Sequence, residues 1–155
     1  MNLRFHLILE ISHEPVLQLG TRLEIVGKIG FELTDRYLKR AGLDYWDNVN
    51  WDYYPDAEKY MTQLDPDKVH LLTSKVKTSY TNVAFNDGDY LIFGSETHGV
   101  DKRYMDLFSK QCCTIPMKKG GVRCLNLSNS AAIVLYEALH QTNWASFGGV
   151  SQADI

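Results

Sequence analysis

The chain has 155 residues, of which 45% are hydrophobic and 23% charged, and its formal net charge is −3. This length suits one compact domain over residues 1–155 with a substantial core. No stretch approaches the roughly 20 apolar residues of a membrane span, and His6, Glu10 and His13 interrupt the apolar run near the N-terminus. We therefore expect no signal peptide, no membrane partner and a cytoplasmic location. The net negative charge argues weakly against a general nucleic-acid coat protein.

Apolar runs rich in β-formers alternate along the chain with segments of helical periodicity. In chain order, strands are predicted over 3–11, 21–27, 48–54, 68–74, 89–95 and 111–117, and helices over 32–42, 56–64, 100–110 and about 128–143. This alternation predicts an α/β domain with a mostly parallel sheet and helices on both faces. The tail from about 145 to 155 is predicted to be loose.

Ligands of such sheets bind beyond the carboxyl ends of the strands, which directs attention to the loops after residues 72, 93 and 117. The first motif there is "FGSETHG", residues 93–99, whose glycines permit positive φ or a close approach of backbone to a ligand. It matches neither the dinucleotide fingerprint nor a P-loop. From spacing alone, a simple turn with Ser95 or Thr97 as a helix cap is favoured.

The second motif is "IPMKKGGVRCLNLSNS", residues 115–130, where a basic glycine-containing loop leads into an apolar helix. One of Asn126, Ser128 and Asn129 is expected to cap that helix. The remaining polar groups either face a ligand, for which the backbone N–H groups of the helix start favour an anion, or bond to neighbouring backbone.

The last predicted helix is apolar on nearly all sides. Its main apolar face comprises Leu127, Ala131, Val134, Leu135 and Ala138. Outside that face fall Ile133, Tyr136 and Leu139. A helix of this kind is buried on more than one side, so we expect it to form the interface of a symmetric homodimer.

Charge is unevenly distributed along the chain. Residues 44–67 hold seven acids and one base, residues 101–123 hold six bases and two acids, and Arg36, Lys39 and Arg40 form another basic group. The segment "KRAGLDYW", residues 39–46, adds aromatic side chains to that group and suits an RNA backbone with a stacked base. Ordinary solvated surface and a packed helix end are equally good explanations.

The cysteines and histidines give no sign of a metal site. Cys112, Cys113 and Cys124 make an odd set without a CxxC motif, and the five histidines are scattered without ligand spacing. We expect reduced thiols and no bound metal.

Four of these stretches, "KRAGLDYW", "DGDYLIFGSETHG", "IPM" and "RCLNLSNSAAIVLYEALHQ", in this order and spacing, resemble the SPOUT-class RNA ribose methyltransferases. The resemblance runs from about Gly20 to about Trp144 and is closest to the small tRNA (cytidine/uridine wobble-position) 2'-O-methyltransferases. It implies an α/β sheet with a C-terminal trefoil knot, an obligate homodimer, S-adenosylmethionine as cofactor and tRNA as substrate.

The resemblance also implies roles for particular residues. The cofactor would contact Leu72, Thr73, Gly94, Glu96, Ile115, Met117, Cys124 and Leu125. Asn126 and Ser128 would organise the catalytic site. Lys39, Arg40, Tyr45 and Arg123 are the candidates for RNA binding.

Two positions depart from the family pattern. The family's N-terminal motif E-I-P-x-N-T-G-N-x-x-R carries an arginine that activates the 2'-hydroxyl, whereas "LEISHEPVLQLGTRLEIV", residues 9–26, has no NTGN, and Arg22 falls on the next strand. The catalytic arginine is therefore not identifiable. The chain is an impaired homologue, or Arg4 or Arg123 takes that role, or this N-terminal sequence is not the native one. The usual serine is replaced by Cys124, a weaker hydrogen-bond donor.

Overall fold

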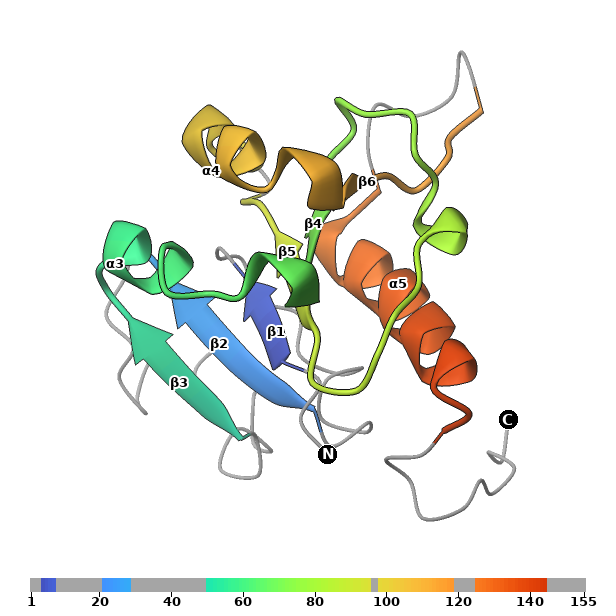
Figure 1. Cartoon of the computed structure of the whole chain (residues 1–155), viewed down its shortest axis with the longest axis horizontal. Helices are drawn as coiled ribbons and strands as arrows, with labels where there is room; N and C mark the ends of the chain where they lie inside the picture. The colour runs from blue at the N-terminus through green and yellow to red at the C-terminus, as the bar shows by residue number, and fades with distance from the viewer. Residues whose placement is uncertain (1–3, 8–20, 29–49, 96–97, 119–124, 145–155) are drawn as a thin grey trace.

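The computed structural model describes residues 4–7, 21–28, 50–95, 98–118 and 125–144, and within them six strands form one sheet (Figure 1). The order across the sheet is β3-β2-β1-β5-β4-β6, and every pairing is parallel. The strands are β1 (Arg4–Leu7), β2 (Arg22–Val26), β3 (Trp51–Tyr54), β4 (Val69–Leu72), β5 (Tyr90–Phe93) and β6 (Cys112–Cys113). Each of the six predicted strands therefore contains an observed one, and the parallel sheet is confirmed.

Within the described ranges, three α-helices connect or follow these strands, and each overlaps a predicted helix. They are α3 (Ala57–Met61), α4 (Lys102–Leu107) and α5 (Leu127–Gln141). Short 3₁₀ turns that the sequence pattern did not predict are η2 (Pro66–Lys68), η3 (Tyr80–Asn82) and η4 (Ser109–Gln111). The helix predicted over 32–42 and the predicted loose tail lie outside the described residues.

The helices cover both faces of the sheet, as expected for buried parallel strands. Successive side chains of a strand point to opposite faces, so Ile92 packs with Met61 of α3 and Phe108, which follows α4. The neighbouring residue Leu91 packs in the other core with Val134 of α5. Figure 1 shows α3 and α4 together on one side of the sheet and α5 on the other.

The core face of helix α5 is wider than predicted. Leu139 is fully buried in the same core as Leu135, so the expectation that it falls outside the core face is wrong. The physical reason is the helical repeat, because Ala131, Leu135 and Leu139 are spaced by four residues and share one stripe. Ile133 and Tyr136 are 36% and 48% exposed on the single chain, which agrees with their predicted position outside this face.

Strand β6 is much shorter than the predicted 111–117, but its neighbourhood is well tied. Thr73 N donates to Cys113 O at 2.9 Å, Thr114 N donates to Thr78 O at 2.8 Å, and Tyr80 N donates to Thr114 O at 2.9 Å. The segment after β4 thus runs beside the segment after Cys113. Regular pairing cannot continue through Pro116, which has no N–H to donate.

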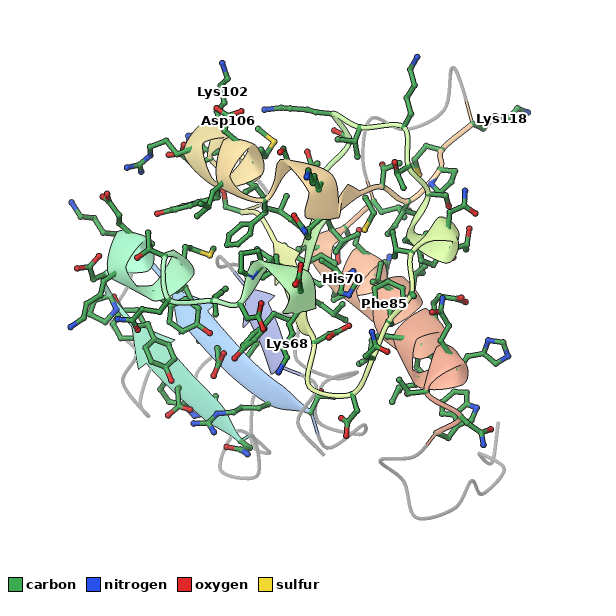
Figure 2. All side chains as sticks on the ribbon, in the orientation of Figure 1. Lys68, His70, Phe85, Lys102, Asp106 and Lys118 are labelled. Carbon is green, nitrogen blue, oxygen red and sulfur yellow. The ribbon has the colours of Figure 1, made fainter. Side chains whose placement is uncertain are left out.

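A buried polar pair fixes the turn that precedes β5. His70 Nε2 lies 2.8 Å from Asp89 Oδ2, and the same carboxylate oxygen accepts from Asn86 N at 2.7 Å. The ring of Phe85 lies against His70, with centroids 4.6 Å apart (Figure 2). These contacts satisfy polar groups inside the core and anchor the entrance to the strand.

Candidate functional site

A cavity of about 530 Å³ lies beyond the carboxyl ends of β4, β5 and β6 and beside the start of α5. Its lining comprises Leu72, Thr73, Ser74, Lys75, Phe93, Gly94, Ser95, His98, Gly99, Val100, Thr114, Ile115, Met117, Leu125, Asn126, Leu127 and Ser130. The loops after residues 72, 93 and 117, where the sequence predicted a site, therefore meet around one cavity. Parallel strands bring these loops together because their carboxyl ends share one edge of the sheet.

The loop after β5 folds back on itself, and Gly94 makes this possible. A Cβ added at Gly94 would overlap the backbone of Gly99 and Val100. Ser95 closes the turn, because its carbonyl accepts from Gly99 N at 2.8 Å and its Oγ accepts from His98 N at 3.1 Å. Gly99 has a φ of 67°, in the left-handed region that glycine tolerates.

Ser95 therefore shapes the turn and does not cap the following helix, which corrects one expectation from spacing. The cap of α4 is Asp101, whose carboxylate accepts from Arg103 N at 2.9 Å. The other candidate cap, Thr97, lies outside the described residues.

The wall after β4 is held in place by Thr73. Its hydroxyl oxygen accepts from Lys75 N at 3.3 Å, and its hydroxyl donates to Met105 Sδ of α4 at 3.6 Å. This local turn holds the backbone of Lys75, another lining residue, beside the cavity.

The polar cluster at the start of α5 has one cap, Asn126. Its side-chain oxygen accepts from Ser128 N at 2.9 Å and also from the Ser128 hydroxyl. The Ser130 hydroxyl donates to Asn126 O at 3.1 Å. Asn126 and Ser130 both line the cavity. Ser128 is not part of the lining, but it donates both of its hydrogen bonds to the side chain of Asn126. The sequence left two alternatives for the extra polar groups, which were bonding to neighbouring groups or facing a ligand. The hydroxyls of Ser128 and Ser130 both bond locally to Asn126, and Asn126 and Ser130 also line the cavity.

The structure brings most of the predicted cofactor residues together. Leu72, Thr73, Gly94, Ile115, Met117 and Leu125 all line the cavity with Asn126. Outside the described residues lie Glu96, Cys124, Lys39, Arg40, Tyr45 and Arg123. Sequence reasoning missed Lys75, Ser95, His98 and Ser130, although their position in loops at the carboxyl edge was an available signal.

The lining combines an apolar slot with hydroxyl and amide groups. Among the described lining residues there is no carboxylate and one lysine, Lys75. Such a site favours a ligand with an apolar ring and hydrogen-bonding edges.

Two of the arginines considered from the sequence lie at the amino ends of their strands, whereas the cavity lies beyond the carboxyl ends. Arg22, at the amino end of β2, donates from Nε to Asp52 Oδ2 at 2.7 Å, and this bond raises the pKa of the guanidinium. The register places the α-carbon of Arg4 beside Tyr90, three residues and roughly 10 Å before Phe93 at the cavity. The described residues thus support neither as the cation beside the cavity, and Arg123 lies outside them.

The two described thiols are suited to packing, not to chemistry. Cys112 and Cys113 are buried and unpaired, and neither lines the cavity. Burial raises the pKa of the Cys113 thiol to about 12, so it stays protonated at neutral pH. In the described parts of the chain, no group of three His, Cys, Asp or Glu side chains is arranged to hold a metal ion. No helix in those parts is long and apolar enough to cross a membrane.

An α/β sheet of this order, with a cavity built from glycine-containing loops at its carboxyl edge, defines a class of small-molecule-binding domain. Residues 17–136 match the family model described as SpoU rRNA Methylase family. Because that match covers most of the chain, the chain belongs to this family, and the resemblance seen in the motifs is confirmed.

Two relatives are similar over most of their length. A tRNA (cytidine(34)-2'-O)-methyltransferase of Methylovorus glucosotrophus is 40% identical over 127 residues, which cover 81% of this chain and 82% of the relative. A protein of Synechocystis sp. named "Putative tRNA (cytidine(34)-2'-O)-methyltransferase" is 44% identical over 124 residues, which cover 79% of this chain and 80% of the relative.

Solved structures agree on the fold. One, described as "Structural insights into the 2-OH methylation of C/U34 on tRNA", superposes with a TM-score of 0.72 at 30% identity and covers 90% of this chain and 94% of its own. Another is the SpoU methyltransferase AviRb of Streptomyces viridochromogenes in complex with AdoMet, with a TM-score of 0.66. It is 18% identical and covers 91% of this chain and 60% of its own, so it supports the fold alone.

Proposed function

We propose that the chain is an S-adenosylmethionine-dependent tRNA 2'-O-ribose methyltransferase that acts at the anticodon wobble nucleotide. The observation that carries the proposal is the cavity, in which loops from three strands and the start of α5 bring the motif residues together. The names of the relatives, which are similar over about four fifths of the chain, support the reaction and the nucleotide.

The cavity fits the proposed cofactor. Its volume of about 530 Å³ lies within the usual range for small-molecule sites. Because Gly94 has no side chain, the backbone of Gly99 and Val100 can pack directly against it, and a Cβ at this position would clash with that backbone. Leu72, Ile115 and Leu125 would form the apolar slot for adenine, and Thr73 and Met117 would complete the wall. Glu96 and Cys124 are proposed contacts from the motifs alone.

When bound, the cofactor supplies a methyl group on a sulfonium, and the chain must align it with a ribose hydroxyl. Asn126 and Ser128 would organise this edge of the site, because their mutual hydrogen bonds fix the start of α5. A cation near the hydroxyl would stabilise the oxygen as its proton leaves. Arg123 is the candidate that the sequence leaves, and it also belongs to the proposed RNA contacts with Lys39, Arg40 and Tyr45.

The proposal includes the wider architecture of the family. We propose one methyltransferase domain over 1–155 with a C-terminal trefoil knot, acting in the cytoplasm without a bound metal. We also propose a homodimer through α5, supported by the apolar side chains of Ile133 and Tyr136, which are 36% and 48% exposed on its outer face.

A second candidate is a homologue that binds cofactor and RNA without turnover. The missing NTGN…R motif between Ile11 and Val26 favours it. Calorimetry would then show S-adenosylmethionine binding without methyl transfer, and an N-terminal loop bearing the family arginine would restore activity. Failure of that loop to restore activity counts against this candidate.

The proposed function is tested with tritiated S-adenosylmethionine and total tRNA. We expect incorporation of label into tRNA above the level of a boiled sample. No incorporation, with cofactor binding intact, would favour the second candidate. Absence of both binding and incorporation would contradict the assignment of the cavity.

A further inference from the structure

The charges of this chain are segregated across the sheet. At one edge, β3 carries Asp52, and Asp56 and Glu58 lie at the start of α3, which follows β3. At the other edge lie β6 and the segment after β4. The sequence there contains no Asp or Glu from 73 to 86 or from 107 to 136. The lysines in these two segments therefore have no acidic residue near them in the sequence.

Three lysines of this edge belong to two segments that run side by side. Lys75 and Lys77 lie in the segment after β4, and Lys118 follows the cavity residue Met117. The bridge between Ser79 and Thr114 and the backbone bonds around it hold the two segments together. We call these three lysines the basic wall.

The charges of the basic wall are not neutralised by described carboxylates. None of its three ammonium groups forms a salt bridge with a described carboxylate, whereas Arg103 of α4 is paired with Asp101 and Glu58. All three lysines are exposed, and Figure 2 shows Lys118 extending away from the ribbon. Unpaired lysines on one wall suit a chain of phosphates, because each contact releases a counterion.

The wall is also correctly placed for a reaction on ribose. Lys75 lines the cavity itself, so a phosphate held there would be next to a nucleotide entering the cavity. Sugar-phosphate contacts position a nucleic acid without reading its sequence. We infer that Lys75, Lys77 and Lys118 hold the RNA backbone beside the target nucleotide, with the acidic β3 edge directed away. This inference rests on the proposed function and goes beyond the RNA contacts expected from the motifs.

The test compares Lys77→Gln/Lys118→Gln with the matched double variant Lys59→Gln/Lys68→Gln. Both pairs are exposed lysines, but Lys59 and Lys68 lie in α3 and η2, away from the cavity, and Figure 2 shows Lys68 well separated from Lys118. Dissociation constants for tRNA are measured over a range of salt concentrations, and S-adenosylmethionine binding is measured in the same samples.

We expect the wall variant to bind tRNA roughly fivefold or more weakly at low salt, with the log–log salt slope reduced by about 0.7 to 1 per lysine. Cofactor binding should be unchanged, because neither substituted lysine lines the cavity. If the wall variant binds tRNA like the control, with the same slope, the inference is wrong although the proposed function stands. If the unmodified chain binds no tRNA at low salt, the proposed function itself is wrong.

Discussion

At the scale of single residues, Gly94 and Asn126 carry different parts of the site. Gly94 is required for space, because the backbone of Gly99 and Val100 occupies the position of its missing side chain. Asn126 is required for its oxygen, which accepts from both the amide and the hydroxyl of Ser128. The motifs singled out both residues, but spacing alone did not indicate that Ser95 would close the loop around Gly94.

Gly94→Ala should weaken cofactor binding. The added methyl group meets backbone, so the loop from 94 to 99 must open and the cavity must change shape. We expect S-adenosylmethionine affinity measured by calorimetry to fall at least tenfold. Gly88→Ala is the control, because Gly88 has a φ of 88° and nothing within 4 Å of the added Cβ. It should cost roughly 1–2 kcal/mol of stability but leave affinity unchanged. Equal affinity in both variants would contradict this account of the loop.

Asn126→Ala should lower the free energy of unfolding by about 1 kcal/mol, as expected for loss of a helix cap. Asn126→Asp keeps an acceptor oxygen and should restore that stability in urea unfolding. If Asn126 also contacts the ligand through its amide, cofactor affinity will stay reduced in the Asp variant. Full recovery of both stability and affinity would limit Asn126 to capping.

At the scale of elements, the strands were predictable because buried parallel strands read as short, nearly continuous hydrophobic runs. The order of the strands in the sheet was not predictable, because the pairing of strands that are distant in the chain leaves no pattern in the local sequence. Strand β6 was overestimated, since the apolar run through Ile115 and Met117 continues into the cavity lining instead of the ladder. Leu139 was misplaced by judging the helix face too narrowly.

Helix α5 divides into buried and exposed parts, which makes its proposed dimer role testable. Val134 is fully buried, so Val134→Asp should unfold the chain, at a cost of about 4 kcal/mol or more. Tyr136→Asp should instead leave the fold intact and convert a dimer to a monomer in sedimentation. Leu107→Asp, also 48% exposed but on α4, is the control and should remain dimeric. A wild-type chain that sediments as a monomer would contradict the interface.

At the scale of the whole molecule, the sheet order explains how a chain with a net charge of −3 can serve an anionic substrate. The strand β3, with its acidic neighbours, and the strand β6, with its acid-free neighbours, form opposite edges of the sheet. The sequence revealed the acidic block at 44–67 and a basic block at 101–123, but it did not single out Lys75, which the structure places in the cavity lining. The proposed RNA contact at 39–45 falls outside the described residues.

The central claim is that this cavity serves methyl transfer to a tRNA ribose at the wobble position. The most direct measurement incubates unmodified tRNA transcripts with the protein and S-adenosylmethionine, digests the RNA and maps the methylated nucleoside by mass spectrometry. We predict one methyl group on the ribose of the wobble nucleotide, with a much lower yield at limiting S-adenosylmethionine when Gly94→Ala replaces the wild-type chain. Methylation of a base, methylation at another position, or full activity of Gly94→Ala would contradict the account.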